Sequence, residues 1–371
     1  KVKKYILKTI KLLFKYFYRK IIKTLFIILY GRVFVNDNYS NNYKILTLKD
    51  SNIKKLNKKN YKICSIEDGR ICTDGVEQVA YISENKIIEK FSYTQVNGSL
   101  VPSRKNFVIK KGTPYFLKKY DGVVASLAQG ASGDHNYFHW MFDILPKIKI
   151  ITSFYNIKEI NYFYMPKILN YQKKILEELG IKKIKFINSN KYKHIQASKI
   201  IIPDHPWYFK GKIYDNVAKL PKWIILWLRS SFLKKSISTK KPIKLFIDRT
   251  ESIYNHCKLI NNEEMTTKLK KEGFKIIQVG KLSFKQQIKL FNNAKIIIGV
   301  HGAAFANLIF CKPKTKIIEI KPKNRPNNYK TISKINNLNY KQFVTEIVSN
   351  KNSNEGDTYI NPKKVINEIY K

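Results

Sequence analysis

The chain has 371 residues, more than the roughly 250 to 300 at which a single hydrophobic core stops growing, so we expect two domains. Its net charge is +45, but only seven of its 71 basic residues are Arg, the residue that binds phosphate and guanine through a bidentate fork. The sequence also contains no RNA-recognition, zinc-finger or aromatic-basic motif. We therefore exclude specific nucleic-acid binding as the expected function.

The excess of Lys, with abundant Asn, Ile and Tyr, is typical of the codon bias of an AT-rich genome. A surface this basic still attracts anionic lipids and nucleotides in a salt-dependent manner. The four cysteines, Cys64, Cys72, Cys257 and Cys311, are too few for a disulfide framework and lack paired metal-type spacing, which favours a reducing compartment.

Residues 1–32 are predicted to form a basic amphipathic helix that lies on an anionic membrane surface. One helical stripe of this segment carries its basic residues, and the other faces carry Leu, Ile, Phe and Tyr; the stripe consists of Lys4, Lys8, Lys11, Lys15, Arg19 and Lys23. Packing of the helix on its own protein is the alternative. No uncharged window approaches the roughly 18 residues of a membrane span. Because the sequence starts at Lys1 rather than Met, we leave open whether a segment precedes it.

Residues 33–229 are expected to form a β-rich segment followed by a Rossmann-like domain. Short alternating segments, including "FVIKKGTPYFL" at 107–117, predict strands up to about residue 125. Beyond it the pattern predicts helices over 171–180 and 220–229 and strands over 183–187 and 198–203. The aperiodic stretch 230–242 is predicted to be an interdomain linker.

Residues 243–371 are predicted to form a doubly wound domain with a parallel sheet. Strands rich in Ile and Val, over 243–249, 274–280, 295–300 and 315–321, alternate with helices over 261–273, 283–294 and 303–310. The last 40 residues are expected to be a loop and a terminal helix.

The stretch "IIIGVHGAAFANLIF" at 296–310 breaks at His301 and Gly302, between a predicted strand and a predicted helix. Such folds bind ligands at the carboxyl edge of the sheet, and the first amides of a helix are free to bind phosphate oxygens. Gly302, Ala303 and Ala304 would let a diphosphate approach the backbone. A tight strand-to-helix turn would need the same small residues.

Two charged residues at strand ends support the phosphate hypothesis. Arg249 would neutralise phosphate and Glu319 would accept both ribose hydroxyls. A salt bridge of Arg249 with Glu251 and a structural role of Glu319 are the alternatives.

A second constellation, "GDHNYFHWMFDILPKI" at 133–148, predicts a helix from Asn136 to Leu145 that Pro146 ends. His139 and Asp143 would then lie one turn apart, and either could accept a proton from a hydroxyl nucleophile. A metal site of His135, His139 and Asp143, or a merely structural helix packed by Tyr137, Trp140 and Leu145, are the alternatives.

These motifs resemble glycosyltransferase family 61 over about residues 65–371. The resemblance rests on "NYFHWMFDILP", "DRTESIYNHCKLINNEEM", "EGFKII", "FKQQIKLFNNA", "GVHGAAFANLIF", "KIIEI" and "YINPKKVINEI". It implies a GT-B fold, in which two Rossmann-like domains face a cleft, and inverting transfer without a cofactor or a required metal. The donor side would consist of Arg249, Lys258, His301, Gly302, Ala303, Ala304, Asn307 and Glu319, and the acceptor side of Asn136, Tyr137, His139, Trp140 and Asp143. Family members usually carry Arg where this chain has Lys258, and Lys keeps the charge but loses the fork.

The expected function is transfer of a sugar from a nucleoside-diphosphate donor, expected to be UDP-linked, to a hydroxyl of a glycan or lipid-linked glycan. We expect the setting to be capsule or lipopolysaccharide synthesis on the inner face of the cytoplasmic membrane. A catalytically silent, membrane-associated protein that binds a glycan or a nucleotide is the alternative that Lys258 suggests. A polyanion-binding protein is a third.

Overall fold

The structure is a computed structural model, and it describes residues 2–35, 42–48, 53, 60–75, 77–128, 136–233, 242–251, 257–348 and 356–371, with side chains from residue 9 onward. The contacts between residues divide it into two compact units, each built from three segments. Unit 1 consists of Lys1–His135, Asp143–Ile168 and Lys182–Ile213, and unit 2 of Asn136–Phe142, Leu169–Ile181 and Tyr214–Lys371.

These units differ from the predicted domains because three segments before residue 230 pack with the C-terminal part, namely 136–142, 169–181 and 214–229. The helix α8 (Lys222–Phe232) contributes buried Trp223, Ile225 and Leu228, and Arg229 donates to the carbonyls of Ile309 and Cys311, the latter at 2.8 Å. The predicted linker at 230–242 begins inside α8, and residues 234–241 lie outside the described residues.

Unit 2 contains a five-stranded parallel sheet with the order β14-β13-β15-β16-β17. Its strands are β13 (Ile243–Ile247), β14 (Phe274–Ile277), β15 (Ala294–Val300), β16 (Lys316–Pro322) and β17 (Asn339–Thr345). Its helices are α6 (Asn170–Glu178), α7 (Ile213–Val217), α8, α9 (Asn262–Lys271), η4 (Val279–Lys281), α10 (Phe284–Asn293), η5 (Ala303–Phe310), α11 (Asn328–Ile335) and α12 (Pro362–Ile369), with α4 (Tyr137–His139) from the segment at 136–142.

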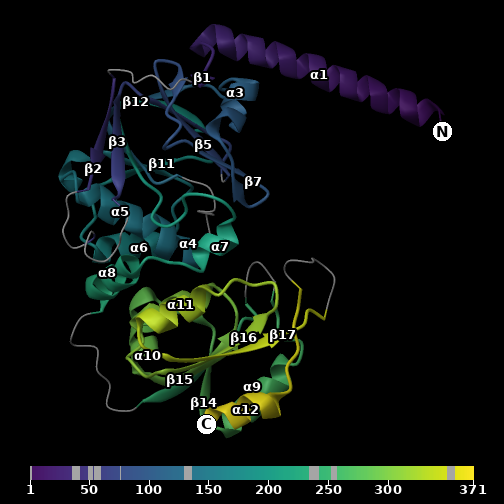
Figure 1. Ribbon diagram of the computed structural model, residues 1–371, viewed down its shortest axis with the longest axis vertical. Helices are drawn as coiled ribbons and strands as arrows, with labels where there is room; N and C mark the ends of the chain where they lie inside the picture. Colours follow the sequence, from purple (N-terminus) through teal and green to yellow (C-terminus); the bar gives the residue numbers. More distant parts are fainter. Residues whose placement is uncertain are drawn as a thin grey trace. The chain divides into compact units, whose positions relative to one another are not determined.

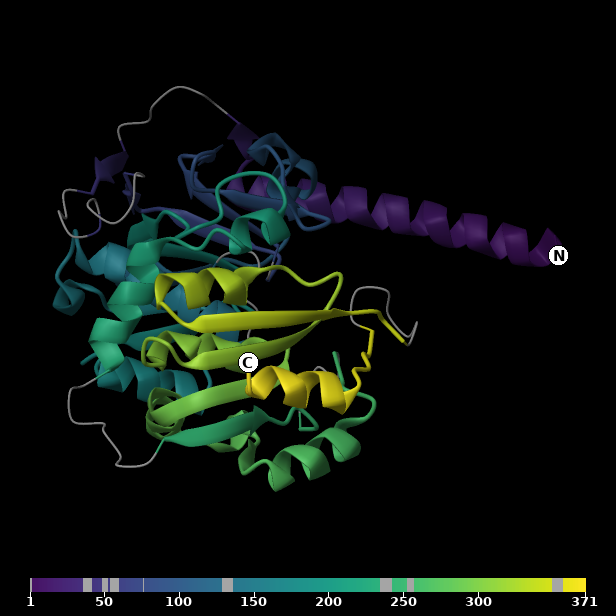
Figure 2. The same cartoon turned by 60° about the horizontal axis from the view of Figure 1, so that its bottom comes forward.

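Helices cover both faces of this sheet, as predicted for a doubly wound domain (Figures 1 and 2). On one face, Ile296, Ile298 and Val300 of β15 share a core with Met265 of α9 and Val365 of α12. The other face is covered by α10, η5 and α11. The predicted 303–310 helix is a 3-10 helix, and β17 was not predicted because its sequence, NYKQFVT, has no buried apolar run.

Unit 1 contains a mixed sheet with 12 strands among its described residues, in which strands of the predicted β-rich segment and strands of the predicted Rossmann-like part are joined. Strands β9, β10, β11 and β12 pair in parallel in the order β12-β9-β10-β11, whereas β3 and β4 pair antiparallel to β12. The strands are β1 (Phe34–Val35), β2 (Tyr43–Thr47), β3 (Lys62–Glu67), β4 (Arg70–Thr73), β5 (Gln78–Ser83), β6 (Lys86–Ile87), β7 (Tyr93–Val96), β8 (Ser99–Leu100), β9 (Lys118–Ser126), β10 (Tyr162–Met165), β11 (Lys185–Asn188) and β12 (His194–Pro203). Its helices are α1 (Val2–Tyr30), η1 (Ser103–Lys105), α3 (Phe107–Lys111), α5 (Leu145–Thr152) and η3 (Ile157–Glu159).

Two local predictions in this part of the chain are wrong. The stretch 107–117 begins with helix α3 rather than a strand, because the Asn106 side chain accepts a hydrogen bond from the Val108 amide and caps a helix there. Pro146 does not end the segment at 136–145. A π-helix, η2 (Trp140–Ile144), separates α4 from α5, and Pro146 occupies the first turn of α5, where its missing N–H costs nothing.

The N-terminal helix α1 is anchored near its C-terminal end. Phe26 is 5% exposed and packs against Phe116, and Arg70 donates to the Tyr30 carbonyl at 3.0 Å. Within the described residues, no helix combines the length and the apolar composition that a membrane crossing requires.

Candidate active site

The sheet order of unit 2 predicts a ligand crevice at the carboxyl ends of β13 and β15. This order is of the type 2-1-3-4-5, in which β13 and β15 are the first and third strands along the chain. The connections that leave these two neighbouring strands run to opposite faces of the sheet. In folds of this type a crevice opens between the carboxyl ends of the two strands. Arg249 follows β13 by two residues and His301 follows β15 directly. The Arg249 guanidinium donates a hydrogen bond to the His301 carbonyl, so the structure brings these two predicted residues together.

Glu319 fixes the orientation of the His301 ring. Its Oε1 lies 2.5 Å from His301 Nδ1, and its Oε2 accepts a hydrogen bond from the Tyr340 hydroxyl. With the carboxylate ionised, Nδ1 carries the proton, and Nε2 of the ring is the nitrogen left for a ligand. Glu319 is 1% exposed. Its carboxylate therefore accepts hydrogen bonds from His301 and Tyr340. The sequence had predicted that it would bind the ribose hydroxyls of a ligand.

Burial lowers the pKa of His301, and the hydrogen bond that its Nδ1–H donates to the Glu319 carboxylate opposes this effect. The positive charges of Arg325 and Arg249 lower it further, which places both guanidinium groups close to the imidazole. Burial also lowers the pKa of Arg249. Two cations and a histidine near one another in a half-buried crevice attract an anion, since the anion relieves their mutual repulsion.

Gly302 makes room for Arg249. Its φ of 174° and ψ of 168° are extended values that any residue adopts, so backbone strain does not explain the glycine. A Cβ built on it, however, would lie 2.5 Å from Cζ of Arg249 and 2.7 Å from its Nε and Nη1. The Gly302 carbonyl accepts a hydrogen bond from the Tyr329 hydroxyl at 2.7 Å, and the Tyr329 and His301 ring centroids are 4.9 Å apart.

Arg325, rather than Lys258, is the second cation beside Arg249. Lys258 is exposed, whereas Arg325 donates from Nε to the Cys257 sulfur at 3.1 Å. Its Nη2 is buried and has no hydrogen-bond partner among the described residues. Arg325 was not among the predicted site residues, although Arg is rare in this chain, with seven occurrences, and its fork suits a phosphate.

The two residues after Gly302 leave their backbone accessible to a ligand, and the residues that follow are buried in the core. Ala303 and Ala304 are half-buried, and every residue from Phe305 to Phe310 is buried. Asn307 is fully buried, donating to Gln287 Oε1 at 3.0 Å and to the Ala304 carbonyl at 3.2 Å while accepting from the Tyr137 hydroxyl at 2.8 Å. It therefore holds η5 in place, and the first turn of η5 remains the part that a ligand can reach.

The predicted acceptor-side segment packs within unit 2, against the same elements. Asn136 caps α4 by accepting hydrogen bonds from the amides of Phe138 and His139. Phe138 makes an edge contact with Tyr329 at 6.0 Å between centroids, and Tyr329 also contacts His301. Trp140 is buried and His139 is half-buried. Tyr329 thus links the segment that carries His139 to the crevice that contains His301.

Asp143 belongs to unit 1 and is fully buried there. It accepts a hydrogen bond from the Trp207 indole at 2.7 Å. Its charge opposes the lowering of the Lys147 pKa, which burial depresses to about 7. Lys147 is also fully buried and donates to the Leu127 carbonyl at 3.2 Å. A carboxylate with this burial is held by the core, whereas half-buried His139 is accessible to a substrate.

No group of three or more His, Cys, Asp or Glu side chains suitable for a metal ion occurs among the residues the structure describes. His135, the first residue of the metal hypothesis, lies outside them.

The comparisons with known proteins identify the class of enzyme. The family model described as Glycosyltransferase 61 matches residues 137–318, a span that runs from α4 past η5. This match supports glycosyltransferase family 61, and the protein is a glycosyltransferase.

Among solved structures, the chain is similar to the dodecameric iron-containing heptosyltransferase TibC in complex with ADP-D-beta-D-heptose. The two share 12% identity over 76% of this chain and 79% of that one, at a TM-score of 0.30, too low to support an argument. No curated protein matches the sequence.

Proposed function

We propose that the protein transfers a sugar from a nucleoside-diphosphate donor to a hydroxyl of a glycan acceptor, with inversion at the anomeric carbon. The observation that carries the donor class is the convergence of Arg249, Arg325 and His301 at the ligand crevice of unit 2. These groups match the two negative charges of a diphosphate, and the first-turn amides of η5 add donors for its oxygens. The GT-B class, with the donor on unit 2 and a UDP-linked sugar, belongs to this proposal.

In the proposed reaction, the acceptor hydroxyl loses its proton to a base, and its oxygen attacks the anomeric carbon in line. The bond from that carbon to the diphosphate oxygen breaks, and the diphosphate leaves with the electron pair. Arg249 and Arg325 stabilise the charge that develops on the leaving group, and His301 adds to this effect at the low pH at which its ring is protonated. Fixed cations at this place can neutralise the diphosphate, as a divalent metal ion does in other transferases. We therefore propose that the reaction requires no divalent metal ion.

We assign the base to His139 rather than to Asp143. A base must reach the hydroxyl that it deprotonates, and His139 is half-buried whereas Asp143 is fully buried against Trp207. An imidazole also accepts a proton near neutral pH. Asp143 then has a structural part in the core of unit 1.

The experiment first screens nucleotide sugars by thermal shift and then measures release of the nucleoside diphosphate with EDTA present. We expect turnover in EDTA and a loss of roughly 10²-fold or more in Arg249→Ala and Arg325→Ala. Arg104→Ala removes an exposed Arg of unit 1 and should behave like the wild type. Binding of no nucleotide sugar would contradict the proposal, and activity that EDTA abolishes and Mg²⁺ restores would contradict metal independence.

We further propose that α1 attaches the enzyme to the inner face of the cytoplasmic membrane, where it acts in capsule or lipopolysaccharide synthesis. Large apolar side chains are exposed along α1, among them Phe14 at 71% and Ile28 at 75%, and basic residues accompany them. The four cysteines are free thiols, which suits a reducing compartment.

Truncation of residues 2–22 tests the membrane attachment while sparing the core contacts of Phe26 and Tyr30. We expect the truncated protein to lose sedimentation with vesicles that contain phosphatidylglycerol. Unchanged sedimentation would refute the attachment.

A further inference from the structure

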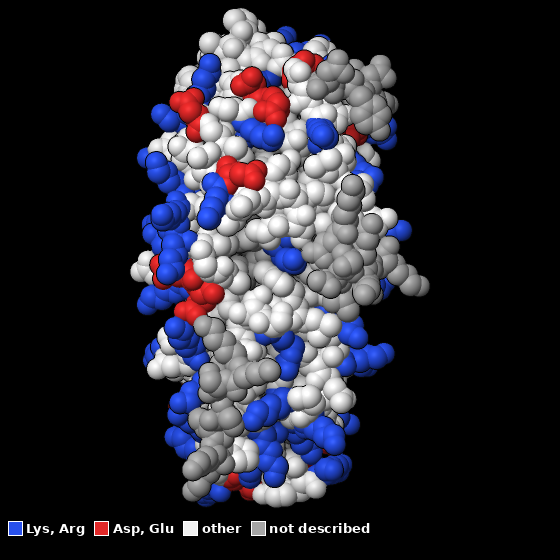
Figure 3. All heavy atoms as spheres, turned by 90° about the vertical axis from the view of Figure 1, so that its left-hand side faces the viewer, with Lys and Arg blue, Asp and Glu red and all other residues white. Residues whose placement is uncertain are grey.

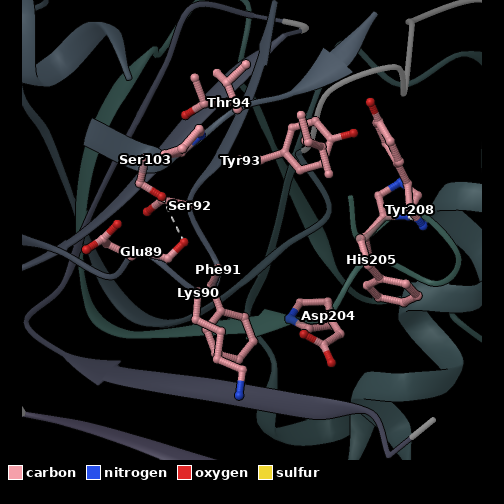
Figure 4. Close-up of a pocket in the computed structure, with 15 residues that line it drawn as sticks. Glu89, Lys90, Phe91, Ser92, Tyr93, Thr94, Ser103, Asp204, His205 and Tyr208 are labelled. Atoms are coloured by element: carbon pink, nitrogen blue, oxygen red, sulfur yellow. Dashed lines mark hydrogen bonds between the residues drawn. The ribbon is translucent and has the colours of Figure 1, made fainter. Parts of the chain in front are cut away.

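Unit 1 contains a cavity that the proposed donor chemistry does not use (Figure 4). Its volume of about 470 Å³ lies within the roughly 300 to 1,000 Å³ of small-molecule sites. The segment Glu89–Thr94, the segment Leu100–Ser103 and the residues that follow β12 line it. All of them belong to unit 1, so the cavity is complete without residues of unit 2.

One side of the cavity is aromatic. Figure 4 shows Tyr93, His205 and Tyr208 together on it. The Tyr93 and His205 rings stack with centroids 6.0 Å apart at 20°, and the Tyr93 and Tyr208 rings meet edge to face at 5.6 Å. Phe209, which is 38% exposed, extends the apolar lining. These rings form an aromatic part of the lining, in which Tyr208 is inclined steeply to the other two.

The opposite side is polar. Glu89, Ser92 and Ser103 lie there in Figure 4, and the Ser103 hydroxyl donates to the Glu89 carbonyl at 3.0 Å. Asp204 also lines the cavity, and its Oδ2 accepts a hydrogen bond from the Lys62 amide at 2.9 Å, which fixes the carboxylate. Aromatic rings across the cavity from serine hydroxyls, with the Asp204 carboxylate beside His205, suit a sugar, which has an apolar C–H face and a rim of hydroxyl donors (Figure 4).

The charge of the lining narrows the class of ligand. Two carboxylates, Glu89 and Asp204, accompany one cation, Lys90, in a chain whose net charge is +45. On the face shown in Figure 3, Lys and Arg side chains are spread widely and acidic ones are sparse, so anions have many other places to bind. The ammonium group of Lys62 also lies beside Lys90, so the charges around the lining nearly balance. A uronic acid or a phosphate finds no net attraction there, which leaves an uncharged sugar as the fitting occupant.

The aromatic side is connected to the segment at 136–146. The His205 Nδ1 accepts hydrogen bonds from the amides of Trp207 and Tyr208, at 3.2 and 2.9 Å, and the Trp207 indole donates to Asp143. Asp143 follows His139, the proposed base, by four residues. The cavity is therefore joined to Asp143 through His205, which lines it, and Trp207, which does not.

We infer that this cavity, between β7 and the residues that follow β12, binds an uncharged sugar residue of the acceptor glycan. The inference rests on the proposed function, which it deepens by naming the class of acceptor.

The test measures binding of cellobiose, lactose and N,N′-diacetylchitobiose by saturation-transfer NMR and calorimetry, with a hyaluronan tetrasaccharide as the anionic probe. Salt of roughly 0.3 M suppresses non-specific attraction to the basic surface. We expect a neutral disaccharide to bind with a dissociation constant on the order of 1 mM and the anionic probe to bind at least about tenfold more weakly.

Phe209→Ala should weaken the neutral sugar about tenfold, because it removes an exposed ring that lines the cavity. Phe116→Ala is the matched control, since Phe116 is 77% exposed in the same unit but outside the lining. Glu89→Gln, which keeps the shape of the side chain, should improve binding of the anionic probe relative to the neutral one. Thermal unfolding of each variant shows whether it is folded.

Three results would overturn the inference: a wild-type protein that binds none of the neutral sugars, a Phe209→Ala variant that binds them like Phe116→Ala, or an anionic probe that binds best. Release of nucleoside diphosphate by the same preparations separates the two hypotheses. Donor turnover without sugar binding refutes the cavity alone, and sugar binding without any donor binding refutes the donor proposal alone.

Discussion

Replacing Gly302 with Ala should disable the crevice by displacing Arg249. The backbone there is extended and accepts any residue, so the whole cost comes from the added methyl group, which would lie 2.5 Å from Arg249 Cζ. Carbon atoms in contact normally lie about 3.5 to 4.0 Å apart, so the guanidinium must shift by roughly 1 Å. A shift of roughly 1 Å in a positioning group costs on the order of 10²-fold in rate. We expect Gly302→Ala to lose about that much kcat/KM.

The assay is nucleoside-diphosphate release from the sugar donor that the thermal-shift screen identifies. Gly280→Ala is the control, because its Cβ would meet Glu251 Oε1 at the longer distance of 3.1 Å and would not touch Arg249. If Gly302 matters only because it makes room for Arg249, the double variant with Arg249→Ala should be no worse than Arg249→Ala alone. A Gly302→Ala enzyme as active as the wild type, or one whose loss persists in full beside Arg249→Ala, would refute this reasoning.

Three further predictions concern the groups around the two histidines and the buried lysine. His139→Ala should reduce single-turnover rates by about 10²-fold or more, whereas Asp143→Asn should mainly lower the unfolding temperature; the reverse ranking would assign the base to Asp143. Glu319→Gln removes the anion that raises the His301 pKa, so the midpoint of the His301 titration measured by NMR should move to lower pH. The pH at which donor affinity is lost should move down with it. An unchanged midpoint would contradict the pairing of His301 with Glu319. Lys147 has a pKa of about 7 when folded and about 10.4 when unfolded, so between these values only the unfolded chain holds the proton. Relative to Lys147→Met, the free energy of unfolding should rise from pH 7 towards 10 by up to about 1.4 kcal/mol per pH unit, and parallel curves would show that Lys147 is not desolvated.

The sequence predicted the C-terminal sheet well because its buried strands are continuous apolar runs separated by amphipathic helices. β17 was missed because Asn339, Lys341 and Gln342 interrupt any such run. The strand order, which creates the crevice, depends on pairing in space and has no local signal. His301 and Arg249 were identified because both follow apolar strands, and the structure brings them together.

The environment of each predicted site residue was beyond the reach of the sequence. Spacing placed His139 and Asp143 one turn apart, but only packing shows that one is half-buried and the other fully buried. Glu319 was expected to face a ribose because nothing in the sequence showed Tyr340 and His301 on its two oxygens. Arg325 lies in an irregular stretch after β16, where hydrophobic periodicity cannot indicate the position of a side chain.

The threading of the chain constrains how this enzyme can be divided or assembled. The polypeptide passes between the two units five times, and unit 2 takes in residues 136–142 and 169–181 before its main segment begins at Tyr214. A fragment that starts at residue 243 would lack α4 and α8, so apolar surface of η5 would face water. During synthesis, residues 136–142 and 169–181 cannot pack until the main segment of unit 2 has left the ribosome. Exchanging donor specificity between homologues would require transplanting all three segments of unit 2.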